Sequence, residues 1–314
     1  MSGPRIKVLH LVGADEDTGG VLSVIRSIQS ATSEACAHSV WVNHRFRQLR
    51  KPDLDLRRSR HLLMETPRFG EFLQRGFRAF LELRKLLKEE SFDVLHAHAR
   101  GPLVVSWLAA TCLGRNLLHT IHAHARRRGL YRWVAKHPRL RTVVLTPAMA
   151  AHYGVTPQPG RIEVISACCG DEYFQLPLAK PGTRDPGIFR LSGVGNIVGW
   201  KRWDLLVRAM GRLSPAARSR LQLDIWGPVP DDAESRAFAE GLDALIRRLD
   251  LSRSIRLRGP TLGVSGVLRE SDWFILPSIE EPCSVALMEA LALGVPAIAS
   301  ASGGNPCLIE NGRT

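Results

Sequence analysis

The chain has 314 residues, of which 45% are hydrophobic and 23% are charged, and its formal net charge at pH 7 is +13. These values are ordinary for a globular protein, and the length is enough for two domains. No run of about 18 apolar residues occurs, so the sequence predicts no transmembrane helix.

The apolar segment at residues 6–12 is short, is followed by acidic residues, and lacks a cleavage pattern. We interpret it as a buried first strand rather than a signal peptide. The six cysteines are scattered without the spacing of zinc ligands. We therefore expect a cytoplasmic protein with reduced thiols.

The excess of positive charge lies mainly in residues 45–60, 84–88 and 126–141. Three interpretations compete: a solvated surface, a patch that meets an anionic membrane, and a nucleic-acid site. Basic residues near an anionic membrane contribute about 1 kcal/mol each. Since neither zinc-finger spacing nor an aromatic RNA-binding pattern occurs, we expect no nucleic-acid partner.

Apolar and amphipathic segments alternate through the first half of the chain. We predict strands at residues 6–12, 39–43, 93–97, 117–121, 142–145 and 162–165, and helices at 22–31, 69–90 and 103–113. In the long helix, we expect an inward face made of Phe72, Leu73, Phe77, Phe80, Leu81, Leu83 and Leu87. This alternation predicts a doubly wound parallel sheet, which places ligands at the carboxyl ends of its strands.

A segment rich in proline, glycine and charge then has the composition of a domain boundary. We predict a first domain at residues 1–178, a linker at 179–187 and a second domain at 188–314. The second domain repeats the alternation, with strands at 189–194, 221–226, 255–258, 273–276 and 297–300 and helices at 202–213, 233–249, 263–270 and 285–293. The expected fold class is α/β, with two Rossmann-like domains that face a cleft.

The strongest functional signal lies at residues 277–306. Glu281 precedes a predicted helix and Glu289 lies within it, while the turn that contains Cys283 and Ser284 leads to the first helical residue, Val285. Free N–H groups and the positive end of the helix dipole attract phosphate there. Carboxylates on both sides of an anion site suit a nucleotide sugar, whose hydroxyls flank a diphosphate. The alternative is a surface helix with two solvated glutamates.

Three other patterns carry weaker signals. Gly19 and Gly20 follow the first strand and would let a ligand approach the backbone, although a plain tight turn is the alternative. The sequence Asp53-Leu54-Asp55 resembles a metal-binding triplet, but we interpret it as solvated charge in a basic loop. The segment from His119 to His124 contains three histidines that do not share one strand face, so we expect no metal site. The HAH segment at residues 96–98 is interpreted as packing at a strand end.

The pattern at residues 277–296 resembles the donor-binding signature of retaining glycosyltransferases of family 4, which have the GT-B fold. Its matching residues are Pro277, Ser278, Glu281, Glu289, Ala290, Gly294 and Pro296. The resemblance extends from Ile6 to Thr314, and it implies an acceptor domain followed by a nucleotide-sugar donor domain. Members of this fold generally work without a metal ion, because positive side chains and a helix end serve instead.

The resemblance implies roles for both glutamates. Glu281 would lie near the hydroxyls of the donor sugar, and Glu289 would hold the ribose. Cys283 and Ser284 replace the usual Phe-Gly of the turn, but backbone N–H groups can contact phosphate whatever the side chain. The backbone from Cys283 to Val285 is therefore expected to bind the donor.

A second part of the resemblance opens the second domain. The family pattern is Gly-Arg, four residues, then Lys-Gly-x-Asp, and Gly195, Lys201 and Asp204 match it. Asn196 replaces the arginine, and Arg202 occupies the following glycine position. Lys201 is expected to bind the diphosphate and to stabilise the charge that develops on the leaving group, with Arg202 and Asn196 beside it.

Two further positions are carried by the resemblance. His122 matches a histidine near the sugar and the acceptor, where imidazole can donate a hydrogen bond to a hydroxyl or accept one. Gly227 matches a glycine that lets the nucleobase or ribose approach the backbone. The pair Gly19-Gly20 corresponds to a family Gly-Gly that faces the donor phosphate.

We therefore expect an enzyme that transfers a sugar, with retention of configuration, from a UDP- or GDP-linked donor to a glycan or lipid-linked acceptor. It would need no cofactor or metal and would work at the inner face of the membrane. The alternatives are a nucleotide-sugar 2-epimerase of the same fold and a non-catalytic nucleotide-sugar binder. Since family members continue past the position of Thr314, we expect this chain to lack the helices that close the second domain.

Overall fold

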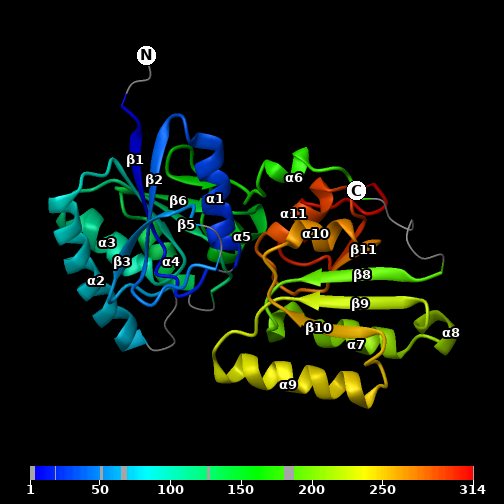
Figure 1. Ribbon diagram of the computed structural model, residues 1–314. Coiled ribbons are helices and arrows are strands. Elements are labelled where there is room, and N and C mark those ends of the chain that lie inside the picture. Colours follow the sequence, from blue (N-terminus) through cyan, green and yellow to red (C-terminus); the bar gives the residue numbers. More distant parts are fainter. Residues whose placement is uncertain are drawn as a thin grey trace. The chain divides into compact units, whose positions relative to one another are not determined.

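The computed structural model describes residues 4–17, 19–49, 52–64, 69–125, 128–179 and 187–313. The chain divides into two compact units, Met1–Ala167 and Cys168–Thr314, and each is built around its own sheet (Figure 1). Among the described helices, none is both long and apolar enough to cross a membrane.

The division lies earlier in the chain than the predicted boundary, because the segment after Cys168 packs within the C-terminal unit. Helix α6 (Glu172–Gln175) contacts helix α11 (Val285–Ala292), and the Ala179 N–H donates a 2.8 Å hydrogen bond to the Leu293 carbonyl. Of the predicted linker, residues 180–186 lie outside the described part of the chain.

The described part of the N-terminal unit holds a seven-stranded sheet with the order β3-β2-β1-β4-β5-β6-β7. All neighbouring strands are parallel. The strands are β1 (Ile6–Leu11), β2 (Cys36–Asn43), β3 (Asp55–Ser59), β4 (Val94–His98), β5 (Leu117–Ile121), β6 (Leu140–Val144) and β7 (Ile162–Val164). The sequence order reverses between β1 and β4, which makes their carboxyl ends the switch point of this sheet.

Strand β3 was not predicted, because its sequence is Asp-Leu-Arg-Arg-Ser and has no apolar alternation. It is an edge strand, and charged side chains there discourage pairing with another chain. The helices of this unit are α1 (Gly20–Thr32), α2 (Phe69–Glu89), α3 (Pro102–Cys112), α4 (Arg128–Ala135) and α5 (Pro147–Tyr153). Helix α1 buries Leu22 and Ile25 against Val40 and Val42 of β2.

The predicted inward face of α2 is partly wrong. Phe72, Phe80 and Leu83 are buried. However, Leu73, Phe77 and Leu81 are 44%, 52% and 47% exposed. These three side chains are spaced by four residues, so they form one stripe along the helix. We call them the α2 stripe.

The described part of the C-terminal unit holds a five-stranded parallel sheet with the order β10-β9-β8-β11-β12. Its strands are β8 (Phe189–Val194), β9 (Leu221–Trp226), β10 (Ile255–Gly259), β11 (Trp273–Leu276) and β12 (Ala297–Ala299). Its remaining helices are α7 (Trp203–Gly211), α8 (Pro215–Arg218), α9 (Ala233–Arg248) and α10 (Val264–Arg269), and two 3₁₀ turns occupy Gly199–Lys201 and Asn305–Cys307. The sequence order reverses between β8 and β11, so the switch point lies at the loops that follow them.

Two hydrophobic clusters cover the two faces of this sheet. Helices α7 and α9 pack on one face around Trp203 and Ile225, while α10 and α11 pack on the other around Phe274 and Leu287. Figure 1 shows the two pairs of helices on opposite sides of the strands. Helices therefore cover both faces of this sheet, which leaves the carboxyl ends of the strands for chemistry.

Removing the Trp203 side chain tests this core. Trp203 is fully buried, whereas Leu205 in the same helix is exposed. We expect Trp203→Ala to lower the free energy of unfolding of the C-terminal unit by about 3–5 kcal/mol, because it leaves a cavity. Leu205→Ala is the control and should change it by under about 0.5 kcal/mol. Urea unfolding followed by circular dichroism measures both, and equal effects would contradict this packing.

Candidate functional site

A buried ion pair lies at the switch point of the C-terminal sheet. Lys201 comes from the loop after β8 and Glu281 from the loop after β11. The Lys201 Nζ donates to Glu281 Oε2 at 2.6 Å, and the two side chains are 9% and 7% exposed. The alternative of a solvated Glu281 is therefore wrong, and Lys201 is withdrawn from solvent with it.

The local backbone explains how Lys201 reaches this position. Gly195, at the end of β8, has φ +153°, and a Cβ there would lie 3.1 Å from Lys201 Cε. Arg202, directly after the lysine, has φ 55° and turns the chain into α7. Glycine adopts this left-handed conformation without cost, whereas another residue loses about 1 kcal/mol. The family glycine that Arg202 replaces therefore serves a turn that this chain still makes.

Glu281 is held from two sides by backbone contacts. The Ile279 N–H donates to the Trp200 carbonyl at 2.9 Å, and the Gly304 N–H donates to the Glu281 carbonyl at 2.6 Å. Gly303 has φ 60°, and a Cβ there would lie 2.2 Å from the Glu281 carbonyl oxygen. The loops after β8, β11 and β12 therefore converge on the ion pair.

An ammonium group has three N–H donors, and the bond to Glu281 uses one of them. The Nζ also lies 4.6 Å from the centre of the Trp200 ring, within range of a cation–π attraction. Beside it, Arg202 Nε is 3.3 Å from Asp204 Oδ1. The loop thus presents two positive side chains at the carboxyl edge of the sheet, and Lys201 keeps donors for an anionic ligand.

Helix α11 begins where the sequence predicts it, at Val285. Ser284 is its N-cap, and its Oγ accepts a 3.2 Å hydrogen bond from the Leu287 N–H. Cys283 is buried just before it. The capped helix start supplies N–H groups and a positive dipole end, although binding of phosphate there stays a prediction.

Glu289 is also buried, on α11, which excludes the solvated alternative for this residue. Burial, and next the charge of Glu289, raise the pKa of the Cys169 thiol to about 11. Glu289 therefore lies close to the segment that precedes α6. The ribose contact expected of Glu289 stays a prediction.

Gly227 and Asn196 have structural reasons of their own. A Cβ on Gly227 would lie 2.0 Å from the Gly195 carbonyl oxygen, so glycine lets the loops after β8 and β9 touch. The Asn196 carbonyl accepts a 3.0 Å hydrogen bond from Trp203 Nε1, which ties the loop to the core. Donor contacts of either residue stay predictions.

In the N-terminal unit, Gly19 has φ 89° directly before α1, and Gly20 is the first residue of that helix. A Cβ on Gly19 would meet nothing within 4 Å, so the loop is open there. Asp17, in the same loop, is buried and pairs with Arg26 at 2.8 Å. The acidic side chain of Asp17 thus contacts a basic neighbour within the N-terminal unit.

In the Asp53-Leu54-Asp55 triplet, Asp53 and Asp55 are exposed, as the interpretation as solvated charge predicts, and each also pairs with an arginine. Asp53 pairs with Arg26 at 2.5 Å, while Asp55 pairs with Arg57 at 2.6 Å and accepts a 2.6 Å hydrogen bond from Ser39 Oγ. Burial is the largest single influence on the pKa of Asp55 and acts to raise it. The hydrogen bonds from Ser39 and Arg57 and the charge of Arg57 together outweigh burial, so the pKa is lowered. The two carboxylates are thus committed to different arginines.

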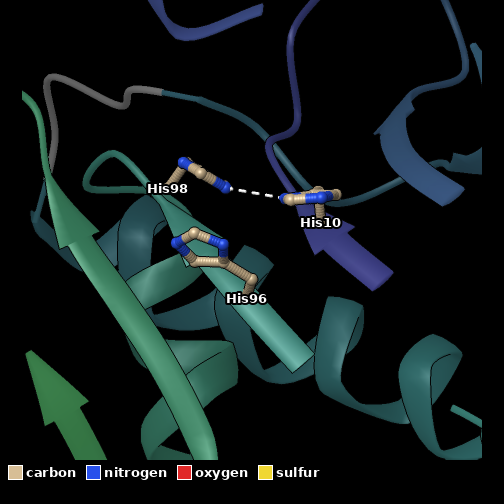
Figure 2. A group of neighbouring side chains, drawn as sticks. All are labelled: His10, His96 and His98. Atoms are coloured by element: carbon tan, nitrogen blue, oxygen red, sulfur yellow. Dashed lines mark hydrogen bonds between the residues drawn. The ribbon is translucent and has the colours of Figure 1, made fainter. Parts of the chain in front are cut away.

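His122 does not stand alone. Its Nε2 is 2.9 Å from His98 Nδ1, and His98 Nε2 is 3.0 Å from His10 Nδ1 (Figure 2). His10 Nε2 is in turn 2.9 Å from His38 Nδ1. His98 is therefore part of a hydrogen-bonded network as well as of the strand packing predicted for it.

Sequence reasoning missed His10 and His38. The pairing of the strands reveals their neighbours, since His10 of β1 stands opposite His96 of β4, but a sequence alone does not give this register. Among the described residues, His10, His96 and His98 are the one group of three side chains able to hold a metal ion, with ligand atoms within 4.8 Å of one another. His119 lies apart, bonded at 3.3 Å to the Ala99 carbonyl.

The fold, with one parallel α/β sheet in each unit, matches that of GT-B glycosyltransferase structures. Residues 189–314 match the family described as glycosyl transferases group 1, and residues 18–168 match glycosyltransferase family 4. The two matches lie one after the other along the chain, and each covers less than half of it.

The chain is also similar to individual glycosyltransferases. The chain is 27% identical over 269 residues to a D-inositol 3-phosphate glycosyltransferase of Streptomyces coelicolor, a match that covers 71% of this chain and 57% of the relative. It is 25% identical over 269 residues to the UDP-Gal:alpha-D-GlcNAc-diphosphoundecaprenol alpha-1,3-galactosyltransferase of Escherichia coli, with coverage of 76% and 65%. The chain thus spans well under the full length of these curated relatives.

Solved structures show the same fold. HepE of Anabaena, crystallised with UDP and glucose, superposes with a TM-score of 0.72 at 15% identity and covers 98% of this chain and 84% of its own. The sucrose-phosphate synthase of Thermosynechococcus elongatus gives a TM-score of 0.76 at 17% identity, with the same coverage.

A double-mutant cycle tests the buried ion pair. Lys201→Met leaves the Glu281 carboxylate buried without its partner, and Glu281→Leu does the same to the ammonium. We expect each to lower the free energy of unfolding of the C-terminal unit by about 3–5 kcal/mol, and the double variant to lower it by less than either.

The control pair is Asp243–Arg247, which is exposed on α9 with a distance of 2.6 Å. Arg247→Met should cost under about 0.5 kcal/mol, because water screens such pairs. Urea unfolding provides the free energies. Additive losses at Lys201 and Glu281 would show that the two side chains do not interact in solution.

Proposed function

We propose that this chain is the catalytic part of a glycosyltransferase that moves a sugar from a nucleotide-sugar donor to an acceptor hydroxyl. The observation that carries the proposal is the buried Lys201–Glu281 pair at the switch point of a domain matched by the glycosyl transferases group 1 family. Switch points are where open α/β sheets bind ligands. The activities named for the two relatives and the UDP and glucose bound to HepE support this choice of donor class.

In the proposed donor site, Lys201 and the N-terminus of α11 receive the diphosphate. Negative charge grows on the diphosphate as the glycosidic bond breaks, and fixed positive groups stabilise that charge without reorganisation. Arg202 adds a second cation from the same loop. Since these groups supply the positive charge, we propose that the transfer needs no metal ion.

The two buried carboxylates take the hydroxyl groups of the donor. Glu281 accepts hydrogen bonds from the sugar while its ion pair with Lys201 holds that lysine in place. Glu289 accepts a hydrogen bond from the ribose. Burial makes such hydrogen bonds strong, because a carboxylate removed from water has few competing donors. The backbone at Gly227 admits the nucleoside.

We place the acceptor in the N-terminal unit, close to His122 and to the open loop at Gly19-Gly20. Closure of the two units would exclude water and bring the acceptor oxygen to the anomeric carbon. Retention of the anomeric configuration is proposed on the family resemblance. A lipid-linked or glycan acceptor suits the diphosphoundecaprenol-linked substrate in the name of the E. coli relative.

The α2 stripe favours a membrane-bound acceptor. Leu73, Phe77 and Leu81 are exposed, and Arg84 and Lys88 continue the same face of the helix and are exposed too. Apolar side chains beside basic ones are what an anionic membrane surface binds. We therefore propose that α2 rests on the inner face of the membrane.

Two rival functions remain distinguishable. A nucleotide-sugar 2-epimerase would isomerise the donor in the absence of any acceptor. A non-catalytic binder would hold the donor without transfer or hydrolysis, also when the chain is extended to the length of its relatives. Incubation with UDP-sugars alone, followed by chromatography of the sugar, separates these outcomes.

Donor binding tests the proposed site directly. A thermal-shift panel of UDP-, GDP- and ADP-sugars should raise the melting temperature for one base. We expect Lys201→Ala to reduce sugar transfer by roughly 10²-fold or more, which is the effect of losing one charge-stabilising group. Glu289→Gln should weaken nucleotide binding. Arg208→Ala, an exposed residue on α7, is the control, and unchanged kinetics in both site variants would refute the site.

Vesicle binding tests the role of α2. Replacing Leu73, Phe77 and Leu81 with serine should lower affinity for anionic vesicles by about tenfold or more, since each buried apolar side chain is worth about 1.5–3 kcal/mol. Replacing Arg84 and Lys88 with glutamine should have a similar effect at low salt. The exposed Leu262 of the C-terminal unit provides the control, Leu262→Ser. Co-sedimentation that is unchanged in both variants would exclude this surface.

A further inference from the structure

Four histidines form a continuous hydrogen-bonded chain across the N-terminal sheet. The order is His38, His10, His98 and His122, with N···N distances of 2.9, 3.0 and 2.9 Å. They come from β2, β1, β4 and the residue after β5, which are neighbouring strands. Each inner histidine uses both ring nitrogens, and the part of this chain drawn in Figure 2 is the link between His98 and His10.

The hydrogen bonds of this histidine chain all point the same way, and the direction is set at the His38 end. Thr32 Oγ lies 2.6 Å from the Ile28 carbonyl oxygen and 2.8 Å from His38 Nε2. A carbonyl only accepts hydrogen bonds, so the single hydroxyl proton of Thr32 goes to Ile28. His38 Nε2 must then carry a proton and donate a hydrogen bond to Thr32 Oγ1.

This direction propagates through every ring. A neutral imidazole has one donor and one acceptor nitrogen. Because His38 donates through Nε2, its Nδ1 accepts from His10 Nε2, and the same pattern repeats through His98. His122 is therefore protonated at Nε2 and unprotonated at Nδ1. Within the described residues, no group donates a hydrogen bond to that Nδ1.

The rings are held neutral by their surroundings. Burial, and next the charge of His38, lower the pKa of His10 to about 3. Burial also lowers the pKa of His122 to about 3, with a smaller contribution from His119. The pKa of His98 lies well below its ordinary value, first through burial and then through its histidine neighbours. A charged ring would break this order of donor and acceptor nitrogens, so neutral rings keep the hydrogen bonds of the histidine chain in one direction.

We propose that Thr32, His38, His10 and His98 are positioning residues that lock His122 in its Nε2–H tautomer, so that Nδ1 presents a lone pair to the substrate. Such a nitrogen binds a hydrogen-bond donor, which for a sugar substrate is a hydroxyl, and it repels a carbonyl or phosphate oxygen. The choice of a sugar hydroxyl rests on the proposed function, whereas the lock itself does not.

A metal ion at His10, His96 and His98 is the competing explanation. The hydrogen bonds argue against it, because both nitrogens of His10 and both of His98 already bond to other histidines. His96 Nε2 is likewise 2.8 Å from Thr120 Oγ1. A ligated nitrogen cannot also take part in these bonds, so a metal would break the chain that orients His122.

Nitrogen-15 NMR of the histidine rings tests the lock. In the unmodified protein, all four rings should show the neutral Nε2–H pattern, with couplings across the N–H···N bonds. Thr32→Val removes the group that sets the direction. The Nδ1–H form of His122 should then rise roughly five- to tenfold, the equilibrium factor for one hydrogen bond.

Two further variants separate the lock from a structural effect. Thr32→Ser keeps the hydroxyl and should restore the original His122 spectrum. Thr111 in α3 is a matched control. Its Oγ1 donates to the Trp107 carbonyl at 2.8 Å and lies 3.3 Å from His137, which is not part of the histidine chain. Thr111→Val should leave His122 unchanged. A His122 spectrum that does not respond to Thr32→Val would overturn the proposal.

Metal analysis and kinetics complete the test. Stoichiometric zinc or another divalent ion on His10, His96 and His98, detected by mass spectrometry of the purified protein, would also overturn it. In the transfer assay, Thr32→Val should raise the KM of the substrate that meets Nδ1 several-fold with a smaller change in kcat, and Thr32→Ser should reverse this. If no sugar is transferred by any variant, the proposed function fails, while the NMR result still decides the lock.

Discussion

The buried contact between Lys201 and Glu281 is the constraint on which the C-terminal site depends. Two opposite charges removed from water lose hydration that their attraction only partly restores, so an apolar pair of similar volume would often be more stable. The contact joins residues far apart in the sequence and fixes the loops after β8 and β11 to each other. A costly pair at the edge of a sheet, where ligands bind, is more easily explained by ligand binding than by stability.

The topology explains why the chemistry gathers where it does. In both sheets, the order of the strands reverses next to the first strand, which leaves the carboxyl ends of two strands without a helix connection directly between them. In the C-terminal unit that position holds the ion pair and the approach of Gly227 to Gly195. In the N-terminal unit it holds the loop at Gly19 and the ends of β1 and β4. The histidine chain crosses the sheet beside this second switch point.

The sequence predicted the parallel sheets well, because buried parallel strands are nearly continuous apolar runs. It failed at β3, whose exposed edge needs no apolar side chains. It also failed on one face of α2, since periodicity identifies an apolar residue but does not say whether a partner covers it. Local patterns identified Lys201 and Glu281 one by one, but no local pattern predicts the contact between them. The histidine chain was missed because strand register, which sets neighbours across a sheet, is absent from a single strand's sequence.

The loop after β8 shows how this chain departs from the family pattern while keeping its electrostatics. Asn196 stands where the pattern has an arginine, and Arg202 stands where it has a glycine. The glycine position requires a left-handed backbone, and Arg202 adopts it at a cost of about 1 kcal/mol. A guanidinium has five N–H donors, and the bond to Asp204 uses one of them. Arg202 thus supplies a second positive charge to a loop in which Asn196 carries none.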